Sequence, residues 1–534
     1  MKRIIASAVI GVLAAMSVAA TPATQPTVAS PPASFFETFR DQDQDAAKAF
    51  YAKYLDVGGL GIASAAVVDD AALYRTREIV GHMLAGRPDI LAAMQQKKTR
   101  LIIIGRDQVY CDMPEYRNSR DPAYQNERVR GTGGFDVTSF GEENLLNLPI
   151  DRYDDESIAV HEFCHTIDSA LRSIDPQWRT RLRDVYRNAV DKGRWNLAYA
   201  GSNQAEYWAE ICQSYFDCNR INNWNHANVK TREQLKEYDP EGYELVRTTF
   251  NLAADKDWRY TPVQEQPSVI APPAKFKVDP YYTKFTFARE LPVIASSAVS
   301  DVAMLRANDT VRKLFAYRHD VLKAIINDGG KLVVLGRGER LTDLPELKST
   351  AATQPAWDNA RYLDYSPVTK IVVVPEENLL GDASDTMNAA SSVVRAMARA
   401  AYIVTAGRPV DPDWDKRPAR SWQQYELRQQ RLDTRLRERL QTLFDQAQSR
   451  KLWRGTPAMT DLLTYWSNGV EAYFDAAGTG YAPVDADRPI VNRESLKAYD
   501  PDLFALIDET FSYRQHTDWR FKVATTRPVL EMGK

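Results

Sequence analysis

Apolar residues recur between positions 158 and 171 at the spacing of a helix that is buried along one face. The apolar positions of this run are Ile158, Ala159, Val160, Phe163, Ile167 and Leu171. Asp154, Asp155 and Ser157 precede the run and are residues that cap helix N-termini. We therefore expect a buried helix that begins close to residue 158.

Shorter apolar runs predict strands. Residues 101–104 and 332–335 are continuously apolar, and a second strand-like run precedes the sequence Glu-Glu-Asn-Leu-Leu at 142–146 and again at 376–380. Residues 62–67 and 294–299 look like helix starts, and helical periodicities fill most of the remainder. The pattern predicts an α+β fold, a mixed sheet with helices segregated from it.

The chain carries this pattern twice. The matching segments are 62–67 with 294–299, 101–106 with 332–337, 142–146 with 376–380, 235–240 with 496–501, and 257–259 with 518–520. We also match Ser202, Asn203 and Glu206 with Ser467, Asn468 and Glu471. The separation of about 230 to 265 residues is far too long for a solenoid repeat. We interpret it as a duplicated domain.

The buried helix of the first copy contains the sequence His-Glu-Phe-Cys-His at residues 161–165. Residues four apart share a helix face, so His161 and His165 can direct both imidazoles at one metal ion. Glu162 lies beside them, where it reaches a water molecule at that ion. Since the chain has only 6 histidines in 534 residues, a chance match is rare. The motif predicts a zinc site.

A catalytic zinc needs a third protein ligand and an open position. Glu206 and Glu210 lie four apart on an apolar helical run, so one is expected to bind the metal and the other to support a histidine. Asp168 and Leu171 stand where the long metzincin motif needs Gly and His, which excludes that class. Asp168, one turn after His165, is either a partner of that imidazole or a solvent-facing residue.

Together these residues resemble the C-terminal metalloprotease domain of anthrax lethal factor and its secreted relatives, among them the Pro-Pro endopeptidases. The matching stretches are 142–146, 160–167 and 199–210, within roughly residues 100 to 220. The resemblance implies a zincin-like fold with Zn2+, with Glu206 as the third ligand and Tyr199 as the residue that assists at the oxyanion. It also implies that an extended peptide pairs with the strand before residue 142. Cys164 departs from the small residue common in that family.

The second copy lacks the motif. Counting forward without a gap from residues 146 and 380 places Arg395, Ala396 and Arg399 at the positions of His161, Glu162 and His165. Guanidinium groups stay charged and cannot ligate zinc. Glu471 is expected at the third-ligand position, paired with one of these arginines. We expect a degenerate copy without catalytic zinc, and a solvated helical insertion at 414–450.

These features divide the chain into six parts. The expected segments are a signal peptide at 1–20, a Pro/Thr-rich spacer at 21–45, a zincin-like catalytic domain at 46–263, a Pro-rich linker at 264–279, the degenerate domain at 280–525 and a tail at 526–534. A short basic start followed by apolar and small residues to position 20 predicts export, to a periplasm or out of the cell. No later run approaches 18 apolar residues, so no membrane span is expected.

Composition narrows the partners. The formal net charge of -3 gives no general attraction to nucleic acid, and the expected partner is a protein or peptide substrate. The four cysteines, at 111, 164, 212 and 218, allow one or two disulfides, or buried thiols at 164 and 212. The sequence names neither the substrate nor the oligomeric state.

Three functions fit these observations. The first is a secreted or periplasmic zinc metallopeptidase with Glu162 as general base. The second is a zinc-binding recognition module without proteolytic activity, for which a closed four-ligand site, with Cys164 as a ligand, would be evidence. The third is a hydrolase of a non-protein amide, which would have an enclosed pocket. We take the metallopeptidase as the leading hypothesis.

Overall fold

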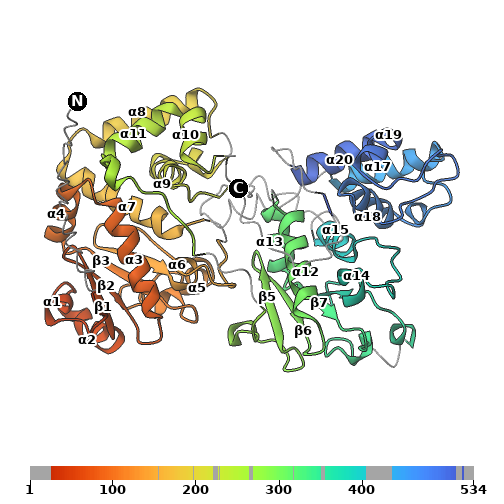
Figure 1. Cartoon of the computed structure of the whole chain (residues 1–534), viewed down its shortest axis with the longest axis horizontal. Helices are drawn as coiled ribbons and strands as arrows, with labels where there is room; N and C mark the ends of the chain where they lie inside the picture. The colour runs from red at the N-terminus through yellow and green to blue at the C-terminus, as the bar shows by residue number, and fades with distance from the viewer. Residues whose placement is uncertain are drawn as a thin grey trace, which may run out of the picture.

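The computed structural model of the chain describes residues 26–153, 156–195, 198–220, 227, 229–263, 269–316, 318–349, 355–404, 436–512 and 520–521. The elements form two groups, drawn from red to yellow-green and from green to blue in Figure 1. Each group contains one four-stranded mixed sheet and many helices. Helices α8, α10 and α11 lie away from the first sheet (Figure 1). This is the α+β class that the apolar pattern predicts.

The first sheet has the strand order β1-β2-β3-β4, with bounds Lys53–Val57, Leu60–Ser64, Arg100–Ile104 and Val137–Gly141. β1 and β2 form an antiparallel hairpin, whereas β2, β3 and β4 run parallel. In β3, Leu101 and Ile103 enter one apolar cluster and Ile102 and Ile104 another. A parallel strand covered on both faces is apolar at successive positions, and this explains the run.

The expected helix starts at 62–67 and 294–299 are wrong. These residues end strands β2 and β6 (Leu291–Ala295), and the helices begin only after a turn, as α3 (Asp70–Met83) and α12 (Asp301–Leu314). Asp69 caps α3 by accepting a hydrogen bond from the Ala71 amide at 2.9 Å. The periodicity of a short apolar run does not distinguish a strand from a helix, and for this reason residues 62–67 and 294–299 were misassigned.

Helices build the remainder of the first group. They are α1 (Ala33–Phe36), α2 (Asp41–Phe50), α4 (Pro88–Lys97), α5 (Pro122–Arg128), α6 (Glu142–Leu145), α7 (Ile158–Ile174), α8 (Trp178–Asp191), α9 (Gln204–Tyr215), α10 (Arg232–Tyr238) and α11 (Pro240–Phe250). Ser157 caps α7 through the Val160 amide, so this helix begins where its pattern predicts. α9 packs against α7, and Trp208 Nε1 donates to the carbonyl oxygen of Cys164 at 2.9 Å. This bond sets the register of α9 on α7.

The repeated Glu-Glu-Asn sequence, at the start of α6, anchors the beginning of the next helix, α7. Glu142 accepts hydrogen bonds from the backbone amides of Asp69 and Arg106 at 2.9 and 2.8 Å. Asn144 accepts one from the Ile158 amide at 2.8 Å and donates to the Glu156 carbonyl oxygen at 2.7 Å. In the second group, Asn378 bonds the Ser392 amide and the Ala390 carbonyl oxygen in the same way. The motif therefore fixes where the helix carrying residues 161–165 starts.

The second group repeats the topology of the first. Its strands are β5 (Lys284–Ala288), β6, β7 (Lys331–Leu335) and β8 (Ile371–Pro375), in that order, with an antiparallel hairpin followed by parallel pairs. Its further helices are α13 (His319–Asn327), α14 (Glu376–Leu380), α15 (Ser392–Val404), α17 (Leu436–Ser449), α18 (Leu462–Tyr473), α19 (Arg493–Tyr499) and α20 (Pro501–Ser512). α17 falls in the stretch expected to be a solvated insertion, but it buries Leu436, Leu440 and Phe444. That expectation is corrected for this helix.

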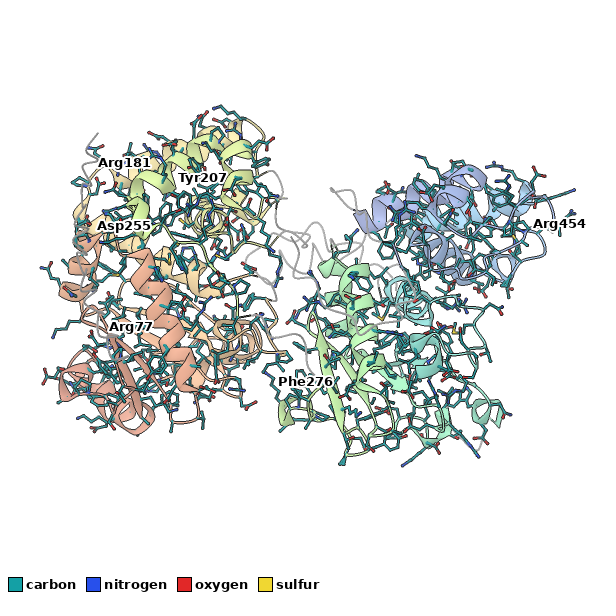
Figure 2. The ribbon with its side chains drawn as sticks, in the orientation of Figure 1. Arg77, Arg181, Tyr207, Asp255, Phe276 and Arg454 are labelled. Atoms are coloured by element: carbon teal, nitrogen blue, oxygen red, sulfur yellow. The ribbon has the colours of Figure 1, made fainter. Side chains whose placement is uncertain are left out.

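Both segments expected as connectors contribute to a sheet edge. Ala29, within the spacer, exchanges two backbone hydrogen bonds with Tyr54 of β1. Ile270, within the linker, does the same with Phe285 of β5. Phe276, labelled between the two groups in Figure 2, packs on Phe285 with ring centroids 4.9 Å apart. The connectors are therefore partly structural.

Some expectations concern residues outside the described ranges. These are the signal peptide at 1–20, the capping residues Asp154 and Asp155, the part of the expected insertion at 414–435, residues 518 and 519 of the repeat, and the tail at 526–534. Among the helices that are described, none combines the length and the apolar character that a membrane crossing requires.

Candidate metal centre

The two histidines of the motif and one glutamate converge between α7 and α9. The Nε2 atoms of His161 and His165 lie 3.2 Å apart, and Glu206 Oε2 lies 3.1 Å from the first and 3.4 Å from the second. Tetrahedral ligands about 2.0–2.1 Å from a zinc ion lie about 3.3 Å from one another. The three side chains therefore fit one metal ion, and this group could hold it.

Local structure explains how Glu206 reaches this position. Asn203 caps α9 by accepting hydrogen bonds from the amides of Ala205 and Glu206 at 2.9 and 3.1 Å. Burial alone would raise the pKa of the Glu206 carboxyl, but hydrogen bonds from His161 and His165 outweigh it and hold that pKa well below its ordinary value. The same contact with Glu206 outweighs burial at His161 and raises the pKa of that imidazole.

Gln213 orients His161 and was not predicted. Its Oε1 lies 2.8 Å from His161 Nδ1, and its Nε2 donates to Glu156 Oε1 at 3.2 Å and to the Ser157 carbonyl oxygen at 3.1 Å. Because the amide nitrogen already donates twice, the amide oxygen faces His161 and accepts from Nδ1–H. With Nδ1 held as the donor to Gln213, Nε2 is the nitrogen left for a metal to bind. The spacing 206, 210, 213 along one helix face was the signal that could have found it.

Glu210 lies behind His161, in the region expected of a supporting carboxylate. Its Oε1 is 3.8 Å from His161 Nδ1, and its other oxygen accepts from Asn219 Nδ2 at 3.2 Å. The hydrogen bond that orients the imidazole nevertheless comes from Gln213. Glu210 therefore contributes negative charge near His161 more than it contributes orientation.

Asp168 has neither of its two expected roles, since it is buried and its partners are Trp178 and Arg172 instead of His165. Asp168 Oδ1 accepts from Trp178 Nε1 at 2.7 Å, and the carboxylate forms an ion pair with Arg172. One turn beyond His165, the helix face has turned toward α8, which carries Trp178. Asp168 therefore ties α7 to α8 and does not support the metal ligands.

A second group of possible ligands, Glu156, His161 and Glu210, also brings its atoms within 4.8 Å of one another. All three residues are buried, and His161 would have to use Nδ1, which already faces Gln213. In the ligand set of His161, His165 and Glu206, the side chains of His165 and Glu206 are 17% and 20% exposed. Of the two ligand sets, only this one is partly exposed and therefore accessible to water, so we take it as the candidate metal centre.

Glu162 is partly buried beside this group. Burial raises the pKa of its carboxyl, and the charges of the two histidines act against that rise. The segment 130–134 crosses this part of α7, and a Cβ added at Gly133 would overlap the Glu162 carbonyl oxygen and lie 2.6 Å from His165 Cβ. Thr132 in this segment pairs with Ser139 of β4. The extended backbone next to Glu162 is therefore this glycine-rich segment and not strand β4. The segment was not predicted from the sequence.

Tyr199 also lies near His161, in the short 3-10 helix η2 (Tyr199–Gly201) before α9. Its ring is nearly parallel to that of His161, with centroids 6.2 Å apart. Burial, followed by the charge of Glu206, raises the pKa of the phenol well above its ordinary value. A neutral phenol is a hydrogen-bond donor, so Tyr199 has the protonation state that stabilisation of an oxyanion requires.

The cysteines lie outside both candidate ligand groups. All four are free thiols, and those at 164, 212 and 218 are buried. Burial raises the pKa of Cys212 and of Cys218. Within the described part of the chain, Cys164 belongs to neither group of possible ligands. A closed site with Cys164 as fourth ligand is therefore not supported.

In the second group, the expected match between Glu471 and Glu206 is wrong. Trp466 Nε1 donates to the Ala398 carbonyl oxygen at 3.1 Å, as Trp208 does to that of Cys164. This equivalence places Thr464 where Glu206 stands and Glu471 where Gln213 stands. The error is seven residues, and the same helix face returns after two turns.

The arginines of the second group have carboxylate partners. Arg395 Nε lies 3.0 Å from Glu471 Oε1, and Arg399 Nε lies 2.8 Å from Asp364 Oδ2. With Thr464 in place of the glutamate, none of the three ligand positions is occupied by a metal-binding side chain. Ion pairs take the place of the metal centre.

Comparisons with known proteins add little. No family model matches the chain, and no curated protein sequence matches it. Among solved structures, the chain is similar to the Pro-Pro endopeptidase (PPEP-2) from Paenibacillus alvei. The identity is 13%, the match covers 36% of this chain and 96% of that chain, and the TM-score is 0.26.

Proposed function

We propose that this protein is a zinc-dependent metallopeptidase with a zincin-like catalytic half. The observation that carries the proposal is the approach of three nitrogen and oxygen atoms, from His161, His165 and Glu206, to within 3.1 to 3.4 Å of one another. Glu162 follows the first ligand on the same helix, and the side chains of His165 and Glu206 remain partly exposed. Three ligands and an open side are the pattern of catalytic, not structural, zinc.

The chain's own residues divide the chemistry of amide hydrolysis. His161, His165 and Glu206 would hold the zinc ion, which would supply Lewis acidity and lower the pKa of a water molecule. Glu162 accepts the proton of the attacking water and donates it to the leaving amine. Tyr199 donates a hydrogen bond to the carbonyl oxygen as negative charge develops there. Gln213 holds His161 in the tautomer that leaves Nε2 for the metal.

The proposal includes a peptide or protein substrate and a location outside the cytoplasm. The partly exposed centre beside the segment 130–134 suits an extended chain better than an enclosed pocket would. The amino-terminal sequence supports export.

Two measurements on the purified mature protein test the proposal. Metal analysis should find one zinc per chain in the parent and none in His161→Ala. A peptide library should then be cleaved by the parent and not by Glu162→Ala, the matched control that keeps every ligand. A parent without zinc would refute the metal centre. A parent that binds zinc but cleaves no peptide would point to a recognition module.

A further inference from the structure

The two groups of elements meet at residues 148–152, immediately before the helix that carries the motif. Ile150 is buried in an apolar cluster that also contains Phe285 and Phe287 of β5, and Leu148 packs against the same cluster. Arg152 Nε lies 3.2 Å from Glu290 Oε1. Figure 1 shows the β5–β6 hairpin at the side of the second group that faces α5 and α6. Residues of the first group are thus held by the second.

Glu290 occupies an unusual backbone position. Arg289 and Glu290 form the two-residue turn between β5 and β6, with φ of 47° and 73°. The equivalent turn of the first group is Gly58–Gly59, with φ of 59° and 83°. Side chains other than glycine are disfavoured in this region, and such strain persists where surrounding contacts offset it. Glu290 is 5% exposed, and its carboxylate also pairs with Lys323 Nζ at 2.9 Å.

A chain of polar contacts leads from this turn to a metal ligand. The Arg152 carbonyl oxygen accepts from the Arg220 guanidinium at 3.2 Å. Arg220 Nε lies 3.7 Å from Glu156 Oε2, and the other oxygen of Glu156 accepts from Gln213 at 3.2 Å. Gln213 in turn orients His161 at 2.8 Å.

The described residues on either side of positions 154 and 155 share one anchor, Asn144. Asn144 donates to Asp151 Oδ2 at 2.9 Å and to the Glu156 carbonyl oxygen at 2.7 Å. A displacement of Arg152 would therefore be transmitted to Glu156, because Asn144 binds both Asp151, the neighbour of Arg152, and the Glu156 backbone.

We propose that the second half of the chain positions the metal centre of the first. Its Glu290 turn holds Arg152, and with it the segment whose Glu156 sets Gln213 and hence His161. Glu290 and Arg152 are positioning residues, and the inference rests on the proposed function because it concerns a ligand of the same centre.

The sharpest variant is Glu290→Gly. It restores the residue type that this turn has in the first group, so the hairpin is retained while the carboxylate is lost. Arg152→Met removes the other partner, and Arg152→Lys keeps its charge. Glu509→Gln is the control, since it breaks an exposed ion pair with Arg439 inside the second group.

Each variant is measured in three ways on the full chain. Zinc affinity is obtained by chelator competition, ligand geometry from the visible spectrum of the cobalt-substituted protein, and the mobility of residues 150–157 from hydrogen exchange. Glu290→Gly and Arg152→Met should lose about fivefold in zinc affinity, somewhat less than direct partners of metal ligands cost. Both should alter the cobalt spectrum and speed the exchange, whereas Arg152→Lys and Glu509→Gln should resemble the parent.

The outcomes separate the two proposals. If the parent binds zinc and Glu290→Gly has the parent's affinity, spectrum and exchange, the positioning role is refuted while the metallopeptidase proposal stands. A fall in melting temperature without change at the metal would also refute it, because the contact would then be structural only. A parent that binds no zinc would overturn both.

Discussion

Gln213→Met is the most informative change at the proposed metal centre. Methionine has a similar length but cannot accept from His161 Nδ1 or donate to Glu156. Loss of the partner that orients a ligating histidine lowers metal affinity by about 10- to 100-fold. That factor equals about 1.4 to 2.7 kcal/mol of binding free energy. Because the imidazole and the carboxylate would both lose a buried partner, the metal-free protein should also lose about 1–3 kcal/mol of unfolding free energy.

The assay separates these two effects. Zinc affinity is measured by chelator competition and stability by denaturant unfolding of the metal-free protein. Asn308→Leu is the matched control, since Asn308 is a buried amide that donates to Thr286 Oγ1 at 3.0 Å in the second group. The control should lose comparable stability and keep the parent's zinc affinity. If Gln213→Met binds zinc as tightly as the control, Gln213 does not orient His161 and the assigned tautomer is wrong.

Three further predictions concern the same centre. Glu162→Ala should keep its zinc and retain less than about a hundredth of the parent kcat, and an unchanged kcat would exclude Glu162 as the base. In the parent, kcat/KM should fall with decreasing pH at a value above 4.5, because burial raises the pKa of Glu162 and only its ionised form accepts a proton. Glu206→Gln should weaken zinc binding far more than Glu210→Gln in metal titrations, and equal losses would show that the ligand is misassigned. Gly133→Ala should lower the melting temperature, because its Cβ would overlap α7. Gly81→Ala, where a Cβ meets nothing within 4 Å, should raise it slightly. Similar shifts in the two variants would mean that the segment 130–134 can move to accommodate the added methyl group.

The sequence was most informative where the chemistry itself dictates spacing. His161 and His165 must be four apart to share a helix face, and the apolar positions around them define a buried helix that begins at Ile158. The apolar pattern also predicted the α+β class with a mixed sheet. The β1–β2 and β5–β6 hairpins were not predicted, because strands of five residues give too short a pattern to separate from a helix.

The residues that sequence reasoning missed or misplaced depend on tertiary contacts. Gln213 acts only because α9 lies against α7. Its spacing places it on the helix face of Glu206 and Glu210, but nothing local identifies a histidine 52 positions away as its partner. Asp168 was misassigned because its partner Trp178 lies on the next helix. Glu471 was misplaced because a shift of two helical turns preserves the face, and only the contact of Trp466 with α15 shows the true register.

The ion pair between Arg395 and Glu471 is an obstacle to forming a metal centre in the second group. Glu471 is fully buried, and burial raises the pKa of its carboxyl while Arg395 opposes that rise. Replacing Arg395 with histidine would remove that opposing charge and leave the buried Glu471 carboxylate without its ion-pair partner, which is destabilising. Thr464 would have to become a carboxylate before any ion could offset the cost. A change of Arg395 to a metal ligand is therefore destabilising until the other ligands are also in place.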